Sequence, residues 1–421
     1  MTSTQRRAVI TGAGVVSPLG NSIDSLWDAL IAGRSGLREM PDGLRGGLPV
    51  FAAGLVDPFD VRGAIGGAFL RPPKGRLSLF VQYSLAAAAD AIRASGLDLR
   101  RLDPARLGVV VGNGAGGAPH LGPHFDALRE RGWSRVDPQV LMQVIPNVAV
   151  AHLANATGAR GYNATLIAAC ASGTQAIGEA ARAVRLGLAD TVIAGGTEAW
   201  VTDIGLISFA VLGALSKWKG DPSGASRPFD KDRTGFVPSE GAAMFVLEEL
   251  RSAVRRGAHI LAEVRGYGCT NDAYHLVAPD PKGVGAAESV RLALEDAGLT
   301  PDDIDYVSAH GTGTVRGDAA ETVALRLALG DRAGRIPVSA AKSMLGHSMG
   351  ASGALEVAAC LKTFETGLIH PTINLDTPDP ICDLDYVSGE ARSARVRAIL
   401  KPSFGFGGHN ATLVLTSPAG I

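Results

Sequence analysis

The stretch LALEDAGLTPDDIDYVSAHGTG, residues 292–313, joins a helical pattern, an acidic link and a short apolar run that ends in a glycine-rich turn. The earlier stretch AADAIRASGLDLRRLDPARLGVVVGNGAGG, residues 88–117, follows the same succession. A helix that stops at glycine and leads through a polar link into a buried strand is typical of layered α/β proteins. Two such units in one chain raise the hypothesis of a duplicated fold, which spacing alone cannot separate from coincidence.

Further segments continue the alternation of strands and helices. Short β-branched runs predict buried strands at 8–11, 107–111, 164–169, 191–194, 304–308 and 336–339. Alanine-rich stretches with apolar residues at helical spacing predict helices at 81–95, 174–186, 286–297 and 354–366. The glycines of Gly12-Ala13-Gly14 do not complete a dinucleotide-binding fingerprint, because Ser17 stands in place of the third glycine. We therefore expect only a tight strand-to-helix turn there.

Composition excludes several classes of protein. The chain has 421 residues, 46% of them hydrophobic, and its 54 glycines follow no collagen-like period. With 40 Lys and Arg against 41 Asp and Glu, the net charge of −1 disfavours a general nucleic-acid or membrane-surface binder. Four widely spaced cysteines fit neither a disulfide framework nor a zinc ribbon, and no apolar run is long enough to span a membrane. We expect a cytoplasmic protein that holds no metal.

Cys170 is the first candidate for chemistry. It lies in Ala168-Ala169-Cys170-Ala171-Ser172-Gly173, between a predicted strand and a predicted helix. The positive end of a helix dipole and free backbone N–H groups would favour its thiolate, which is the nucleophilic form. The small neighbours would let a substrate approach the sulfur. A small buried hydrophobic residue is the alternative reading of a single cysteine.

Two histidines in glycine-rich turns favour the first reading. His310 follows the strand predicted at 304–308, and His347 lies five residues after Lys342. Open α/β sheets bind ligands at the carboxyl ends of their strands, where we expect all of these groups. Cys170 and His347 each precede a glycine by three residues, so a duplicated fold would place them in equivalent positions.

Four motifs in this order resemble the β-ketoacyl synthase family, and the similarity runs from Arg7 to Leu415. They are CASG at 170–173, HGTGT at 310–314, KSMLGH at 342–347 and SFGFGG at 403–408. The resemblance implies the thiolase fold, in which two similar α/β halves form a five-layer α-β-α-β-α sandwich. Residues 1–255 would form the half that carries the cysteine, and residues 256–421 the half that carries both histidines.

The resemblance also implies a role for each site residue. Cys170 would be the nucleophile, His310 and His347 neutral hydrogen-bond donors, and Lys342 an electrostatic organiser. Glu356, with Asp318 or Glu321, would form an ion network with Lys342, and Thr312 and Thr314 would bind the phosphopantetheine arm. Phe406 would act as a gate, and the N–H groups of Cys170 and Phe406 would form an oxyanion hole. Ala115 and Phe209 would lie at the acyl pocket. An acidic carrier protein would dock on Arg71, Lys74, Arg76 and Arg135, for which scattered surface charge is the alternative.

The implied reaction is the decarboxylative condensation of a cysteine-bound acyl chain with malonyl-[acyl carrier protein], without a free cofactor. A thiolase would need a second cysteine near residues 405–410, and a non-catalytic chain-length factor would lack Cys170. Fatty-acid elongation is favoured over the role of a polyketide ketosynthase that works with a chain-length factor. The protein would be a homodimer or a heterodimer with a chain-length-factor homologue. Ala115 and the run Lys217-Trp218-Lys219-Gly220 depart from the usual elongating pattern and keep the polyketide alternative open.

Overall fold

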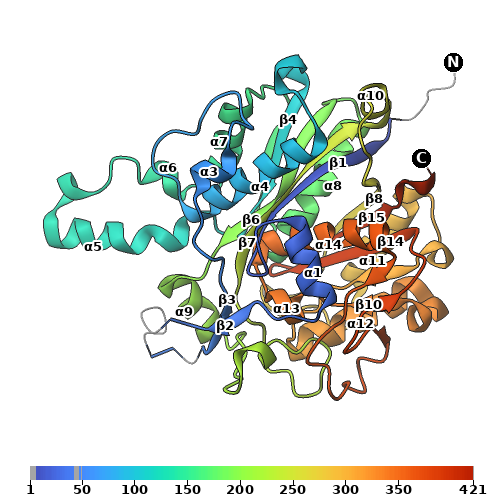
Figure 1. Ribbon diagram of the computed structural model, residues 1–421. Coiled ribbons are helices and arrows are strands. Elements are labelled where there is room, and N and C mark those ends of the chain that lie inside the picture. Colours follow the sequence, from blue (N-terminus) through green and yellow to red (C-terminus); the bar gives the residue numbers. More distant parts are fainter. Residues whose placement is uncertain (1–5, 42–46, 49, 421) are drawn as a thin grey trace.

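The computed structural model describes residues 6–41, 47–48 and 50–420 (Figure 1). The strands of the first half are β1 (Ala8–Val16), β2 (Leu37–Glu39), β3 (Ala52–Gly54), β4 (Leu107–Gly112), β5 (Asn163–Leu166), β6 (Thr191–Ala199) and β7 (Glu240–Glu249). Its helices are α1 (Ile23–Ile31), α3 (Val61–Ile65), α4 (Leu79–Ser95), α5 (Gly122–Arg131), α6 (Leu141–Val144), α7 (Val148–Thr157), α8 (Ser172–Arg185), α9 (Asp203–Val211) and α10 (Leu250–Arg255).

The second half repeats much of this succession. Its strands are β8 (Ala262–Asn271), β9 (Tyr306–Ser308), β10 (Pro337–Ser339), β11 (Leu368–Ile369), β12 (Asp385–Tyr386), β13 (Arg392–Ser393), β14 (Ala398–Gly405) and β15 (His409–Thr416). Its helices are α11 (Val284–Ala297), α12 (Val315–Leu329), α13 (Lys342–Leu345) and α14 (Ser352–Thr366).

The order of the strands shows that the fold is duplicated. In the described residues the main sheet runs β12-β10-β9-β14-β15-β8-β1-β7-β6-β4-β5. The second half has one extra strand, β12, at its edge. When β12 is left out and only the strands of this sheet are counted, each half places, from the centre outward, its first strand, then its fifth, fourth, second and third. The directions match as well, because β1-β7-β6 and β8-β15-β14 are antiparallel while β6-β4-β5 and β14-β9-β10 are parallel. The two halves therefore repeat one fold, which the spacing of the sequence motifs alone did not establish.

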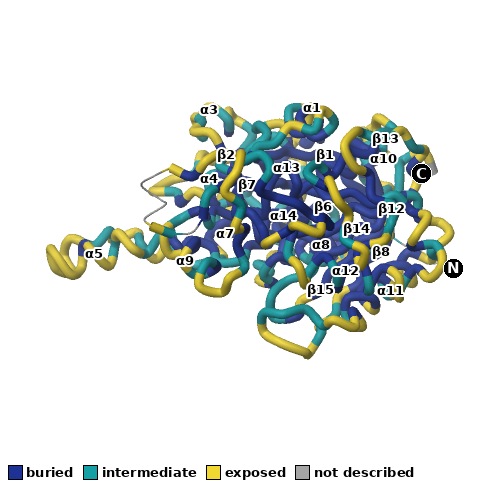
Figure 2. Tube along the Cα trace, turned by 90° about the horizontal axis from the view of Figure 1, so that it is seen from below, coloured by how far each residue is buried: buried dark blue, intermediate teal, exposed yellow. Residues whose placement is uncertain are grey.

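Helices form layers on both sides of the two half-sheets. Helices α8 and α14 contact each other and lie between the halves, whereas α4 and α7 cover the outer face of the first half and α11 and α12 that of the second. Strand alternation separates the cores. Phe245 of β7 faces the central cluster and Val246 the outer one, as do Leu413 and Val414 of β15 in the second half. Figure 2 shows the buried chain concentrated around α8 and α14.

The four predicted helices are present as α4, α8, α11 and α14, and each begins two residues earlier than predicted. The strand predicted at 164–169 ends at Leu166, and the rest of that run forms the turn before α8. The arm that carries α5 extends away from the layered body (Figure 1).

The expected tight turn at Gly12-Ala13-Gly14 is wrong, because these residues lie inside β1. A Cβ atom at Gly12 would stand 2.1 Å from the Ala91 carbonyl oxygen, and one at Gly14 would stand 2.1 Å from that of Ala87. The glycines therefore let α4 pack directly on the strand, which is a second physical reason for glycine in a strand.

Candidate active site

Cys170 lies in a short 3₁₀ turn, Ala169–Ala171, between β5 and α8. Ala169 has a positive φ of 49°, and Met349 has one of 44° in the matching turn before α14. When the two halves are aligned on these turns, Cys170 corresponds to Gly350. His347 lies three residues further from its helix, and the predicted equivalence of Cys170 and His347 is therefore wrong.

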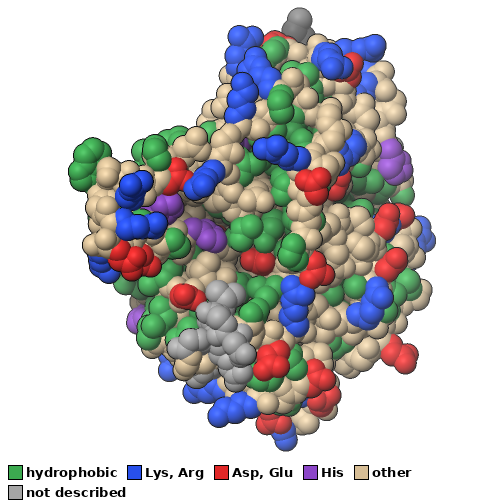
Figure 3. Space-filling model, turned by 60° about the vertical axis from the view of Figure 1, so that its left-hand side comes forward, with side chains coloured by type: hydrophobic (Ala, Val, Ile, Leu, Met, Phe, Trp, Pro, Cys, Tyr) green, Lys and Arg blue, Asp and Glu red, His purple; other side chains and the backbone are tan. Residues whose placement is uncertain are grey.

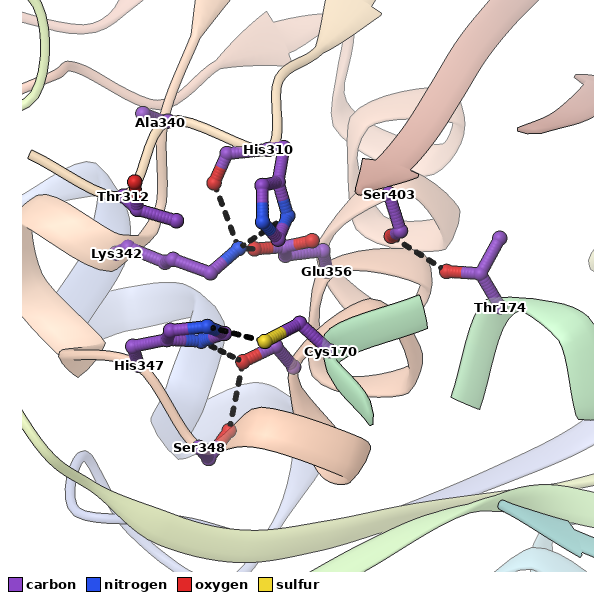
Figure 4. A network of polar contacts seen from close by, with 12 residues as sticks. Cys170, Thr174, His310, Thr312, Ala340, Lys342, His347, Ser348, Glu356 and Ser403 are labelled. Atoms are coloured by element: carbon purple, nitrogen blue, oxygen red, sulfur yellow. Dashed lines mark hydrogen bonds and ion pairs between the residues drawn. The ribbon is translucent and has the colours of Figure 1, made fainter. Parts of the chain in front are cut away.

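The Cys170 sulfur is buried and lies 3.0 Å from Nε2 of His347 (Figure 4). Burial raises the pKa of the thiol to about 11, although the Lys342 charge and the backbone N–H groups of Phe406 and Cys170 act in the opposite direction. The backbone N–H groups of the turn do favour the thiolate, as expected, but the loss of solvation on burial has a larger effect on the pKa. At neutral pH the resting group is a thiol.

The two histidines face each other beside this sulfur. Their ring centroids are 5.5 Å apart with the planes nearly perpendicular. Burial, followed by the positive charge of Lys342, lowers the pKa of both imidazoles well below the ordinary value. Both rings are therefore neutral, as expected. His347 is further fixed through Nδ1, which lies 2.9 Å from the Ser352 hydroxyl.

Lys342 joins the histidine turn to helix α14. Its buried ammonium donates to the His310 carbonyl oxygen at 2.7 Å, lies 3.4 Å from His310 Nδ1 and forms an ion pair with Glu356 (Figure 4). An ammonium has no lone pair, so Nδ1 of the neutral ring faces it as the acceptor. The ring proton then resides on Nε2, where it can donate to a substrate.

Asp318 and Glu321 act on the backbone of the HGTGT turn. Glu321 accepts from the N–H groups of His310 and Gly311, each at 2.7 Å. Asp318 accepts from those of Thr312 and Gly313, each at 3.1 Å. Among their described contacts, neither carboxylate bonds the Lys342 ammonium, so the expected ion network reduces to Lys342 and Glu356 at this point. Burial raises the pKa of Asp318 to about 6 and that of Glu321 to about 7.

One cavity joins most of the candidate residues. Its lining includes the Cys170 sulfur, both imidazoles, the two threonines of the HGTGT turn and the predicted gate and acyl-pocket aromatics, namely Cys170, His310, His347, Thr312, Thr314, Phe406 and Phe209. Phe406 lies between β14 and β15, and its ring centroid is 6.2 Å from that of Phe209. Ala115 does not belong to this lining; it lies in the turn after β4.

Two buried charged residues escaped the sequence reasoning. Glu198, at the end of β6, accepts from the N–H groups of Gly114 and Gly350 at 2.6 and 3.1 Å and so ties the two halves together. Lys401, in β14, has no exposed surface and lies 2.8 Å from Glu356. Each sits inside an apolar strand pattern, and the only available signal was an ionisable residue at a core position.

The proposed docking residues Arg71, Lys74, Arg76 and Arg135 are all exposed. Arg76 pairs with Asp137 at 2.9 Å. The face in Figure 3 carries charges of both signs with hydrophobic side chains between them, and no one sign covers it. Among the described residues, no helix has the length and hydropathy needed to cross a membrane.

Family models match this chain over nearly its whole length. The β-ketoacyl synthase N-terminal domain matches residues 5–253, and the C-terminal domain matches residues 261–376. A 3-oxoacyl-[acyl-carrier-protein] synthase 2 from Coxiella burnetii is 41% identical over 98% of this chain and 99% of its own length.

Solved structures agree with this match. A ketosynthase complex with a type II polyketide synthase acyl-carrier protein contains a chain with 33% identity and a TM-score of 0.89, covering 98% of this chain and 100% of that one. The ishigamide ketosynthase/chain length factor has 36% identity and a TM-score of 0.89, with the same coverage. These relatives share the duplicated α/β fold described above. The chain therefore belongs to the β-ketoacyl synthase family.

Proposed function

We propose that this protein is a 3-oxoacyl-[acyl carrier protein] synthase of fatty-acid-type chain elongation. The observation that carries the proposal is one cavity in which a buried cysteine sulfur meets two neutral imidazoles. A nucleophile beside paired donors suits a reaction that forms a thioester and later stabilises an enolate.

The first step is acyl transfer. The Cys170 sulfur attacks the thioester carbonyl of an acyl chain on the carrier protein, and its proton leaves with the phosphopantetheine sulfur. The developing oxyanion faces the N–H groups of Cys170 and Phe406, which already point at the sulfur region in the free protein. Such preorganised donors lower the barrier because they need no reorientation during the reaction.

The second step is decarboxylative condensation. The malonyl thioester loses carbon dioxide, and the electrons of the broken bond form an enolate. The Nε2–H groups of His310 and His347 donate to the enolate oxygen, and Lys342 keeps His310 in the required tautomer. The enolate carbon attacks the acyl carbonyl, the carbon–sulfur bond to Cys170 breaks, and the sulfur regains a proton.

Other residues position the substrates. Thr312 and Thr314 line the cavity beside the histidines and would bind the phosphopantetheine arm through their hydroxyl groups. Phe406, between flanking glycines, would act as a gate against Phe209 at the acyl pocket, and Ala115 would limit that pocket from behind the cysteine turn. The substrates arrive on the carrier, so we propose no free cofactor and no metal.

The partner and the assembly complete the proposal. An acyl carrier protein would dock on the exposed residues Arg71, Lys74, Arg76 and Arg135. Two copies of the chain would form a homodimer in the cytoplasm, and within each copy the halves would meet between residues 255 and 256. Fatty-acid elongation is preferred to the polyketide role because the 41%-identical relative is a 3-oxoacyl synthase, while the structures with polyketide partners are 33–36% identical.

Substitution of Cys170 by Gln tests the assignment. The variant should lose condensation of acyl and malonyl carrier substrates, whereas decarboxylation of the malonyl substrate should persist, because the histidines remain in place. The substrates and products can be separated by mass spectrometry. Cys269→Gln, at an exposed cysteine outside the cavity, is the control and should condense normally. Undiminished condensation by the Cys170 variant would contradict the proposal.

A further inference from the structure

Lys401 is a buried cation that the mechanism above does not use. It has no exposed surface, although a lysine is among the residues least often buried without a partner. Its ammonium lies 2.8 Å from Oε2 of Glu356, donates to the Ser403 hydroxyl at 3.0 Å and donates to the Pro402 carbonyl oxygen. Three oxygen partners therefore enclose it.

Glu356 stands between two ammonium groups. Its Oε1 pairs with Lys342, and its Oε2 lies in ion-pair contact with Lys401 and accepts no hydrogen bond in the described part of the chain. A buried carboxylate oxygen without a partner is costly, because burial removes the water that would solvate it. Lys401 is thus the ionic partner of the carboxylate oxygen that Lys342 does not reach.

The same lysine reaches the cysteine side of the cavity. Ser403, its second partner, lies 2.7 Å from the Thr174 hydroxyl of α8, the helix that follows Cys170 (Figure 4). Lys401 is also in β14, the strand that ends at Gly405 and leads to Phe406. The Lys401 ammonium is therefore linked through Glu356 to the histidine side of the cavity and through Ser403 to the helix that follows Cys170.

We propose that Lys401 is a positioning residue of the condensation: its ammonium fixes Glu356 and, through it, holds Lys342 against His310. The inference rests on the proposed function. Lys401 touches no reacting atom; it supplies a fixed positive charge beside the Glu356 oxygen that Lys342 does not pair with. Through Ser403, Lys401 also helps to position helix α8, which follows Cys170.

The charge has a second consequence for the histidines. It adds to the effect of Lys342 in lowering the pKa of both imidazoles. Groups that face the ammonium come from helices α12, α13 and α14 and from the histidine turns; they are Glu321, Lys342, Glu356, Cys360, His310 and His347. Removing the charge raises the imidazole pKa, because the protonated ring is no longer repelled.

Lys401→Met, which keeps an unbranched side chain one atom shorter than lysine and removes its charge, is the main test. We expect kcat for condensation to fall about tenfold, less than the 10²- to 10³-fold loss typical of a direct oxyanion donor. The acid limb of the pH profile of kcat/KM should move to higher pH by about half a unit to one unit. A purely structural defect would lower the rate without moving this limb.

Two further variants separate charge from packing. Lys401→Arg keeps the charge, so its acid limb should coincide with that of the wild type. Lys362→Met removes another largely buried lysine, which pairs with Asp24 and Glu365 at the far end of α14, and should leave the profile unchanged. Circular dichroism and thermal melting confirm that each variant is folded.

The outcomes are distinct. A wild-type protein that does not condense its substrates contradicts the proposed function itself. An active wild type with a folded Lys401→Met variant of unchanged acid limb overturns the role of Lys401. Should the Met variant not fold, Lys401→Arg decides, because an acid limb displaced in that folded, charged variant would equally overturn the inference.

Discussion

At the scale of single residues, burial has opposite consequences for the histidines and for the cysteine of the site. Desolvation makes both imidazoles neutral, which suits hydrogen-bond donors, yet it also keeps Cys170 protonated. In the proposed mechanism the thiol therefore becomes reactive only in the complex, when the carbonyl of the substrate thioester meets the N–H groups of Cys170 and Phe406. A cysteine that stays protonated in the free protein is protected from oxidation and adventitious alkylation.

Alkylation of Cys170 measures this protection. With its pKa raised to about 11, the thiolate fraction and hence the iodoacetamide rate should rise about tenfold per pH unit from pH 7 to pH 10. Mass spectrometry of the peptide that contains Cys170 gives the rate, and Cys170→Ser gives the background from exposed Cys269. A rate that reaches its plateau below pH 8 would contradict the buried-thiol description.

At the scale of elements, the sequence predicted helices better than turns. Apolar periodicity located four long helices, α4, α8, α11 and α14, to within two residues of their first residues, because a buried helix face repeats regularly. It did not predict α12, which is 15 residues long. The glycines of β1 have the same sequence appearance as turn glycines, and only the contact with α4 reveals their role. Motif resemblance located Cys170, His310, Lys342 and His347, but Lys401 has no motif of its own and was found only from its partners.

The segment between α3 and α4 carries three of the residues on which we propose that the carrier protein docks. Reversing the charge of Arg71 and Lys74 in the double variant Arg71→Glu/Lys74→Glu should raise KM for the carrier-bound substrate about tenfold, because an acidic partner would be repelled. The kcat value should remain unchanged, since neither residue lines the cavity. Steady-state kinetics at low ionic strength measures both constants.

Arg251→Glu/Arg255→Glu, at two exposed arginines on α10, makes the same change in net charge and should leave KM unchanged. If the Arg71→Glu/Lys74→Glu variant keeps the wild-type KM, the carrier docks elsewhere on the molecule. If kcat falls while KM rises, the substitution has disturbed the site as well as the encounter.

At the scale of the whole molecule, duplication explains why the site lies where it does. Both halves place a turn with a positive φ at a non-glycine residue, Ala169 or Met349, before a central helix. The cysteine comes from one half and the histidines come from the other. Strand order could not be read from the sequence, because it depends on which strands meet across the sheet. The family resemblance supplied this architecture, and the matching order β1-β7-β6-β4-β5 and β8-β15-β14-β9-β10 bears it out.

The outer edge of this sheet predicts the assembly. Among the described residues, strand β5 ends the sheet and pairs only with β4, and Ile167 just beyond it is 55% exposed. An open edge beside an exposed apolar side chain is a surface that proteins cover. In the proposed homodimer a second copy would cover it. Native mass spectrometry should therefore give twice 43.3 kDa. Ile167→Asp should shift the population to 43.3 kDa, because the new charges would be buried together at the interface, whereas Leu186→Asp, 68% exposed at the end of α8, should not. A monomeric wild type contradicts the homodimer, and co-purification of a homologue without the cysteine would replace it by a heterodimer.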